Sequence, residues 1–193
     1  MAESSTARAS AHDLELVALT ATGGRDAFGE LIRRHGSAVR GLLRRMGADA
    51  ALADDLAQDA FLAAFQQVSD FRGEGTFQAW VKRIAARLYV KRWRREAQGK
   101  AAALMAMEDG AEPIEPHNDD RIDLDEALNS LPRAERLCVS LCYGAGLSHA
   151  EAAEALNAPL GTVKSHVKRG LDRLRRRLAP GRDFGPAEVD VHG

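Results

Sequence analysis

Apolar residues recur every three or four positions through most of this chain, which is the period of an amphipathic helix. Gly, Pro and helix-capping residues interrupt the pattern and divide it into segments. No stretch alternates polar and apolar residues in the manner of a strand, and no internal repeat is present. The sequence therefore predicts an all-α fold, with helices from residue 13 to Gly23-Gly24, over 26–46, 49–68, 77–97, 123–131 and 133–143, from Ser148, and from Pro159 to residue 178.

The predicted helices fall into two groups, separated by a segment of different composition. Residues 98–122 are rich in Gly, Ala and acids and contain Pro113 and Pro116, a composition typical of a flexible linker. We expect two small helical domains joined by this acidic linker. The predicted divisions are an N-terminal segment 1–22 (with small, polar and disordered residues 1–11), a first domain 23–97, the linker 98–122, a second domain 123–179, and a flexible tail 180–193.

The net charge of −1 over 193 residues conceals two basic blocks with an acidic one between them. Residues 72–96 carry eight Lys or Arg against two acids, a net of +6, and residues 161–182 carry eight against one, a net of +7. Residues 108–126 carry nine acids against one Arg, a net of −8. Arg accounts for 22 of the 27 cationic residues, and its guanidinium suits phosphates and base edges. The two basic blocks indicate contact with nucleic acid.

Composition excludes several other classes of protein. The longest apolar runs, 60–65 and 101–107, are far shorter than the roughly 20 residues of a membrane-spanning helix, so we expect no membrane insertion. The N-terminus lacks the apolar segment of a secretory signal. Two cysteines, Cys138 and Cys142, cannot form a secreted disulfide framework, so a cytoplasmic location is expected.

The most specific local motif lies at residues 148–168. Ser148-His-Ala-Glu151 is typical of a capping box, which satisfies free amides at the start of a helix. Asn157 follows at a turn position, where its tolerance of positive φ is useful. The next helix has a polar first half. This is the layout of a helix-turn-helix, whose second helix enters the major groove. We expect the DNA-contacting side chains to be Thr162, Lys164, Ser165, His166, Lys168 and Arg169.

A second set of motifs occupies the first domain. It comprises Asp54-Asp-Leu-Ala-Gln-Asp-Ala-Phe61, Phe71-Arg-Gly-Glu-Gly-Thr-Phe-Gln-Ala-Trp80 and the basic helix 84–95. This set resembles region 2 of the extracytoplasmic-function (ECF) subfamily of sigma-70 type RNA polymerase sigma factors. Leu131-Pro132, Gly146-Leu-Ser-His-Ala-Glu151 and Gly161-Thr-Val-Lys-Ser-His166 resemble region 4 of the same family. The resemblance covers residues 25–96 and 124–178, in the family's order.

The resemblance implies a dissociable initiation subunit, neither an enzyme nor dependent on a cofactor or metal. It directs core RNA polymerase to promoter DNA, commonly under the control of an anti-sigma factor. The implied contacts with the polymerase β′ clamp are Asp54, Asp55, Gln58, Asp59 and Phe61. The implied contacts with the −10 element are Lys82, Arg83, Arg87, Lys91, Arg92, Arg94 and Arg95. The helix-turn-helix would bind the −35 element, and region 4 would also bind the β flap.

Two positions depart from the family pattern and one segment suggests regulation. Arg87 stands where family members often have Asn, and Lys91 where they often have Asp, so both add positive charge at the −10 reader. Among the aromatic residues of this helix, Trp80 fits the core by its spacing, whereas Tyr89 and Trp93 fit either the core or base stacking.

We also expect the acidic linker of the free protein to lie against the basic recognition helix and mask it.

Alternatives remain open at this stage. The string 161–167 is equally typical of LuxR-type transcription regulators, which act without being polymerase subunits. The aspartates at 54, 55 and 59 and those at 119, 120 and 123 superficially resemble the magnesium-binding motifs of isoprenoid synthases, but no long apolar helices remain to line a prenyl cavity. The cysteines, four residues apart, could bind a metal or sense oxidants, although two small buried hydrophobic residues are the favoured interpretation.

Overall fold

The computed structural model describes the backbone of residues 2–96 and 124–178, and the side chains of residues 12–95 and 124–178. Every regular element in these ranges is helical, which confirms the predicted all-α fold. The predicted linker 98–122, its masking of the recognition helix and the tail 180–193 concern residues outside the described ranges. None of the described helices is long and apolar enough to cross a membrane.

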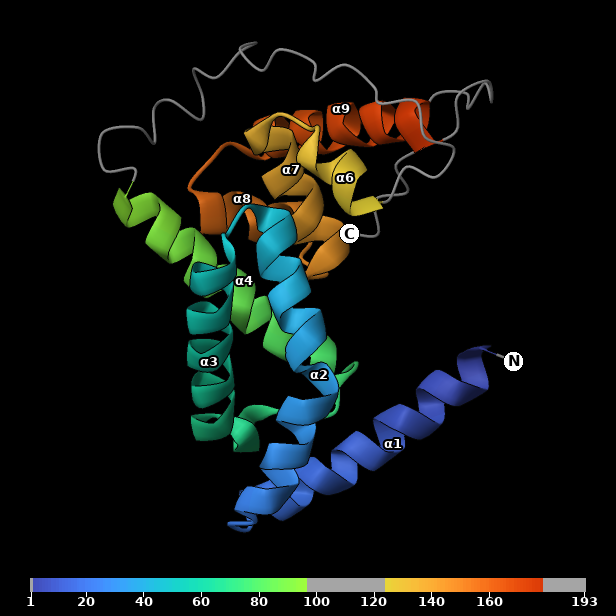
Figure 1. Ribbon diagram of the computed structural model, residues 1–193, viewed down its shortest axis with the longest axis vertical. Helices are drawn as coiled ribbons and strands as arrows, with labels where there is room; N and C mark the ends of the chain where they lie inside the picture. Colours follow the sequence, from blue (N-terminus) through green and yellow to red (C-terminus); the bar gives the residue numbers. More distant parts are fainter. Residues whose placement is uncertain (1, 97–123, 179–193) are drawn as a thin grey trace.

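The first four helices form what we call the N-terminal lobe (Figure 1). Their bounds are α1 Ala2–Ala21, α2 Arg25–Met46, α3 Ala50–Gln66 and α4 Phe77–Glu96, with a short 3₁₀ turn, η1, at Val68–Asp70. Helix α1 begins at Ala2, so the expectation of a disordered segment 1–11 is wrong. Four alanines in the first eleven residues explain the difference, because Ala has the highest helix propensity.

Aromatic packing holds the base of this lobe together. Phe28 of α2 makes edge-to-face contacts with Phe61, Phe65 and Phe77, with ring centroids 5.1–6.4 Å apart. Phe77 in turn begins α4, where the hydroxyl of Thr76 accepts a hydrogen bond from the amide of Ala79 at 3.1 Å. The capping role of Thr76 fixes the point at which the preceding loop ends and α4 starts.

The remaining helices form the C-terminal lobe. They are α6 Leu124–Asn129, α7 Arg133–Val139, α8 His149–Leu156 and α9 Leu160–Leu178, with one wider π turn, η2, at Ser140–Gly144. The predicted capping box is present, since the Ser148 amide donates to Glu151 at 2.8 Å and the Glu151 amide donates to Ser148 at 3.2 Å. Asn157 has φ +52°, which confirms its predicted role at the turn.

The two lobes pack directly against each other, so that most of their buried apolar side chains form one continuous cluster, while a second, smaller cluster lies among α6, α7 and α9. Leu42 of α2 lies so close to Gly144 that a Cβ added there would stand 2.7 Å from its methyl carbon. Arg45 of α2 also forms an ion pair with Asp125 of α6 at 2.5 Å. Helix α8 contacts α4 as well. Most of the buried core is therefore shared by the two lobes.

Candidate nucleic-acid and protein interfaces

Helix α9 presents an exposed polar face in its first half. Val163, His166, Val167 and Gly170 are buried against the lobe, and the other side chains between residues 163 and 170 are exposed. The sequence-predicted contacts on the outward face are Lys164, Ser165, Lys168 and Arg169, which are exposed, and Thr162, which is half-buried. Ser165 donates its hydroxyl hydrogen to the carbonyl of Gly161 at 2.9 Å, so its oxygen remains an acceptor. These side chains form a compact polar surface suited to a groove of DNA.

His166 does not belong to that surface. Its residue exposure is 7%, because it follows Val163 by three positions and precedes Gly170 by four on the buried stripe. Burial, together with the nearby positive charge of Arg169, lowers the pKa of the His166 imidazole. The prediction that His166 stands on the exposed face beside Lys164 and Lys168 is therefore wrong, and its ring serves the packing of the lobe.

The second half of α9 uses its cations internally. Glu135 of α7 has a side chain only 5% exposed, and its carboxylate lies 3.1 Å from Arg173 and 3.9 Å from Arg169. Arg177 pairs with Glu126 of α6 at 3.0 Å. Part of the basic block at 161–182 therefore attaches α9 to its own lobe. The net positive charge that faces outward is concentrated near the start of the helix.

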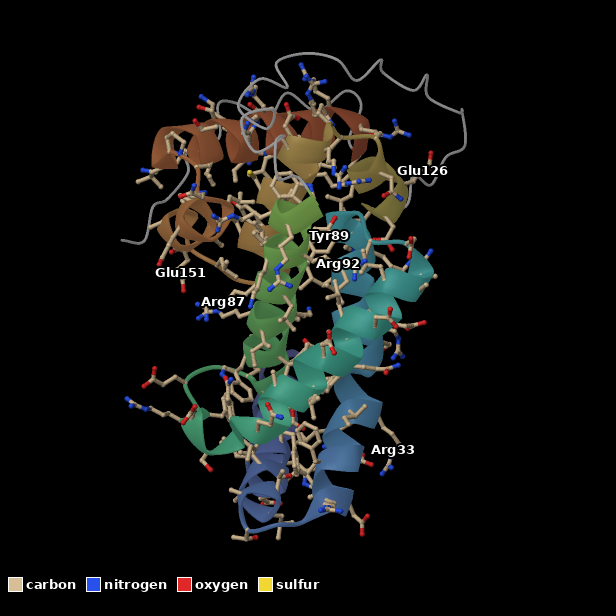
Figure 2. The ribbon with its side chains drawn as sticks, turned by 90° about the vertical axis from the view of Figure 1, so that its left-hand side faces the viewer. Arg33, Arg87, Tyr89, Arg92, Glu126 and Glu151 are labelled. Atoms are coloured by element: carbon tan, nitrogen blue, oxygen red, sulfur yellow. The ribbon has the colours of Figure 1, made fainter. Side chains whose placement is uncertain are left out.

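Helix α4 carries the other basic block, and its middle is covered by the C-terminal lobe. Arg83 donates to the carbonyl of Gly146 at 2.7 Å. Lys82 is half-buried, and this burial lowers the pKa of its ammonium group. Arg87 is exposed but lies on the side of α4 that faces Glu151 (Figure 2). Hydrogen bonding by the Ser148 amide, with help from the charges of Arg83 and Arg87, lowers the pKa of Glu151.

The far end of α4 remains open to solvent. Four of the predicted −10 contacts are exposed there: Lys91, Arg92, Arg94 and Arg95. Tyr89 is buried at 4% exposure and its hydroxyl bonds to Met46, so Tyr89 is a core residue (Figure 2). Trp80 stacks at a tilt on Phe71 with ring centroids 5.3 Å apart, and half-buried Trp93 packs on the core cluster. No aromatic ring of α4 projects freely for base stacking in the described conformation.

Helix α3 offers an acidic face with an apolar edge. Asp55, Gln58 and Asp59 are exposed, and Asp54 is exposed while lying 3.6 Å from Arg40 of α2. Phe61 differs from these four, because its side chain is 5% exposed and packs on Phe28. The ring of Phe61 therefore forms the floor beneath that face, and its implied contact with the β′ clamp stays a prediction.

A groove of about 370 Å³ lies between α2 and α3, next to the acidic face. Its apolar lining comes from six side chains, Phe28, Ile32, Ala57, Phe61, Leu62 and Phe65. Leu62 is 57% exposed and Ile32 is 39% exposed, which is unusual for aliphatic residues that pair across two helices. Sequence reasoning missed this groove, although Leu62 interrupts the polar side of the helical pattern and could have indicated it.

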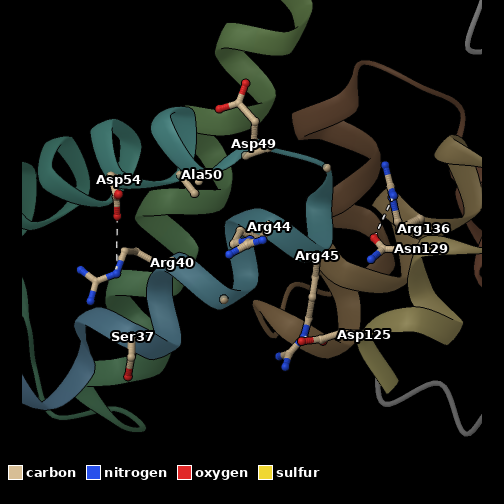
Figure 3. A pocket seen from close by; sticks show the side chains of 14 residues that line it. Ser37, Arg40, Arg44, Arg45, Asp49, Ala50, Asp54, Asp125, Asn129 and Arg136 are labelled. Carbon is tan, nitrogen blue, oxygen red and sulfur yellow. Dashed lines mark hydrogen bonds and ion pairs between the residues drawn. The ribbon is translucent and has the colours of Figure 1, made fainter. Parts of the chain in front are cut away.

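A larger cavity of about 760 Å³ lies at the junction of the lobes, between α2, α3, α6 and α7 (Figure 3). Arginines line it, and most are paired: Arg40 with Asp54, Arg45 with Asp125, and Arg136 with the side-chain oxygen of Asn129. Burial lowers the pKa of Arg136. This cavity belongs to the contact between the lobes, and the ion pair of Arg45 with Asp125 joins one lobe to the other.

The cysteines lie at the centre of the C-terminal lobe. Burial raises the pKa of Cys138 to about 12 and that of Cys142 to about 11, so both remain protonated thiols near neutral pH. Within the part of the chain that the structure describes, no group of three or more His, Cys, Asp or Glu could hold a metal ion. Both observations favour the interpretation of the cysteines as small core residues.

Two family models match this chain. Sigma-70 region 2 matches residues 31–98, and Sigma-70 region 4 matches residues 127–176. The first match contains α3 and α4, and the second contains α7, α8 and almost all of α9. In a LuxR-type regulator the N-terminal domain would be a receiver or a ligand sensor, and a receiver domain alternates strands with helices. The described N-terminal lobe contains no strands. The LuxR-type alternative is therefore not supported.

Relatives of known type extend over most of the chain. The ECF RNA polymerase sigma factor SigE of Mycolicibacterium smegmatis is 36% identical over 79% of this chain, which spans 62% of that protein. The ECF sigma factor SigW of Bacillus subtilis is 30% identical over 81% of this chain and 91% of its own length.

Two solved structures resemble the fold. CnrH, in complex with the cytosolic domain of CnrY, has a TM-score of 0.51 and 28% identity over 89% of this chain and 99% of its own. RpoE of Bartonella quintana, in complex with the anti-sigma factor NepR, has a TM-score of 0.51 and 24% identity over 80% of this chain and 98% of its own, and this match supports the fold alone. The two ordered region matches and these relatives lead to one conclusion: this chain belongs to the ECF subfamily of sigma-70 type RNA polymerase sigma factors.

Proposed function

We propose that this chain acts in the cytoplasm as a dissociable, non-enzymatic subunit that brings core RNA polymerase to promoters with −10 and −35 elements. Residues 23–97 would dock on the polymerase and open the −10 element, and residues 123–179 would bind the −35 element. The observation that carries the proposal is the presence of three chemically distinct exposed surfaces, on α3, α4 and α9, on a chain with both region matches in order.

The surface on α3 suits a protein partner. An exposed carboxylate row next to an apolar groove combines charge complementarity, which accelerates association, with a pocket for a buried anchor residue. We assign Asp55, Gln58, Asp59 and Leu62 to contact with the β′ clamp. Asp54 contributes less directly, because Arg40 already shares its charge. Phe61 supports the groove from below.

The surface on α4 suits a displaced strand of DNA. Opening a duplex requires cations along the phosphates and polar or aromatic groups against the released bases. Arg87, Lys91 and the exposed arginines 92, 94 and 95 supply the charge at successive turns of the helix. Arg83 joins them only after the C-terminal lobe has moved away, because it is hydrogen-bonded to the carbonyl of Gly146 in that lobe. Lys82 is half-buried in the described conformation and contributes less.

The surface at the start of α9 suits the major groove. Thr162, Lys164, Ser165, Lys168 and Arg169 project from one face of a helix whose opposite face is buried. Contacts to bases would specify the −35 sequence, and contacts to phosphates would position the helix. The second domain would also meet the polymerase β flap.

A regulatory partner fits the same picture. Members of this family are commonly controlled by an anti-sigma factor, and the similar CnrH structure is a complex with a second protein, the cytosolic domain of CnrY. We include an anti-sigma factor among the proposed partners of this chain. Such a partner would only need to hold the lobes in the packed arrangement that the free chain already adopts, since that arrangement covers the middle of α4.

The proposal is tested by separating polymerase docking from promoter opening. One variant carries Asp55→Ala, Asp59→Ala and Leu62→Ala on α3, and a second carries Arg87→Asn and Lys91→Asp on α4. We expect the first to lose co-purification with core RNA polymerase. The second should co-purify normally but yield few permanganate-reactive thymines at the −10 element. Asp70→Ala removes an exposed acid on η1 and is the matched control for charge removal. This variant should keep both core-polymerase binding and promoter opening. Equal loss of core binding in both variants would contradict the division of roles.

A further inference from the structure

Helix α1 belongs to the N-terminal lobe but lies before residue 31, where the region 2 match begins. It packs across α2 and also contacts η1 and α4 (Figure 1). Between η1 and α4 lies the loop 71–76, which precedes the basic helix α4. Helix α1 therefore stands against the loop through which the chain enters its proposed −10 surface.

The first specific contact joins Leu14 of α1 to this loop. Gly73 has φ +77°, a conformation that favours glycine, and a Cβ added there would stand 3.2 Å from a methyl carbon of Leu14. Leu14 is 43% exposed, so the contact buries only part of the side chain. Gly75 also has positive φ, at +84°. A loop with two such glycines is intrinsically mobile, and an outside contact restricts it.

The second contact fixes where Leu14 stands. The neighbouring Asp13 has a side chain only 7% exposed, and it pairs with His35 at 2.8 Å and with Arg34 at 3.3 Å. A buried carboxylate requires such partners, because without them it loses its hydration and gains nothing in return. The pairs therefore hold α1 at one rotation and one register on α2. They place Leu14 over the loop.

The third contact reaches the loop from inside the lobe. The His35 ring lies 5.7 Å from that of Phe77, the first residue of α4, and Phe77 lies 5.9 Å from Phe71 at the start of the loop. Trp80 completes this cluster at 5.8 Å from Phe77. Both ends of the loop are thus packed on an aromatic cluster, which His35 connects to Asp13.

We propose that α1 is part of the promoter-opening unit, with Asp13 and Leu14 acting as positioning residues for the loop 71–76. The loop then meets the −10 strand already ordered, and less conformational entropy is lost when the strand binds. This inference rests on the proposed function of the loop and α4, and it adds to them a helix that the region 2 match does not include.

The test compares two leucines of the same helix. Leu14→Ala removes the contact with Gly73, whereas Leu19→Ala removes a side chain that is similarly exposed, at 55%, and for which the structure records no contact with the loop. We expect Leu14→Ala to lower the yield of permanganate-reactive −10 thymines on the order of fivefold, the scale of one lost packing coupling. Core-polymerase binding and the thermal midpoint should match those of Leu19→Ala. Leu14→Met, which keeps an apolar contact, should restore opening.

A double-mutant cycle tests the contact itself. Gly73→Ala introduces backbone strain and crowds Leu14, so its effect on opening should be smaller in the Leu14→Ala background. Strictly additive effects, or equal opening by Leu14→Ala and Leu19→Ala, would overturn the inference. Failure of the proposed function would look different: the Arg87→Asn, Lys91→Asp variant would then open promoters normally. If that variant fails to open them and Leu14→Ala does not differ from its control, this inference alone is wrong.

Discussion

Helices α4 and α9 carry basic blocks of almost equal net charge, +6 and +7 in the sequence, yet the fold uses them differently. In α9, Lys164 and Lys168 are exposed in the first half of the helix, whereas Arg173 and Arg177 further along pair with Glu135 of α7 and Glu126 of α6. In α4, four cations are exposed at the end of the helix, whereas Arg83 in the middle donates a hydrogen bond to the other lobe.

The comparison shows that a basic block is not the same as a basic surface. Guanidinium groups donate hydrogen bonds to carbonyls and form bidentate contacts with carboxylates as readily as with phosphates. Where the chain supplies such a partner, as Glu135 does for Arg173 and Gly146 does for Arg83, the cation is used inside the molecule. The surface left for DNA is therefore smaller than the sequence suggests.

The largest expected effect concerns the ion pairs that attach α9 to Glu135 of α7. Glu135→Gln removes a nearly buried carboxylate that faces Arg169 and Arg173. We expect the free energy of unfolding to fall by about 3 kcal/mol, because the nearly buried position loses its ion pairs and the amide nitrogen of Gln brings a hydrogen-bond donor against the guanidinium donors. Chemical denaturation followed by circular dichroism measures the change. The exposed Glu154→Gln on α8 is the control and should change stability by less than about 0.5 kcal/mol. Similar midpoints for the two variants would show that α9 does not depend on this carboxylate.

The next effect concerns the exposed lysines in the first half of α9. Lys164→Ala combined with Lys168→Ala should weaken binding to −35 DNA, by about 1–3 kcal/mol if either side chain reads a base. Each lost phosphate contact should also reduce the slope of log affinity against log salt by about one. Fluorescence anisotropy at several salt concentrations gives both quantities. Arg176→Ala, exposed near the end of the same helix, should leave both almost unchanged. An unchanged affinity in the double variant would move the DNA surface elsewhere.

The smallest effect concerns the covered part of α4. Glu151→Gln keeps the capping box, since Gln also serves at that position, but removes the charge that faces Arg83 and Arg87. The pKa of Glu151 is lowered in the folded chain, so its contribution to stability is present above the ordinary glutamate pKa of 4.5 and is lost as pH falls below that value. Thermal midpoints of the wild type should therefore fall more steeply on acidification than those of the variant. Parallel pH profiles would contradict the assignment.

Local signals in the sequence predicted much of this molecule. The helices, the capping box at Ser148 and the left-handed turn at Asn157 all depend on residues a few positions apart. Errors arose where the outcome depends on contacts between distant segments. His166 lies at the border of an apolar stripe, where helical spacing alone does not decide which side is buried. The contact between the lobes depends on residues such as Leu42 and Leu141, and nothing in their local sequence names the partner.

The close packing of Leu42 on Gly144 helps to hold the lobes together, and it therefore affects how tightly the chain binds partners elsewhere on its surface. A partner that needs the covered side of α4 binds only those molecules in which the lobes have separated. Its observed dissociation constant is therefore the intrinsic one divided by the separated fraction. A substitution at either residue touches neither polymerase nor promoter, yet it would change how tightly both are bound. Evolution can thus adjust how much of this factor must accumulate before its promoters respond, without altering the sequence that those promoters carry.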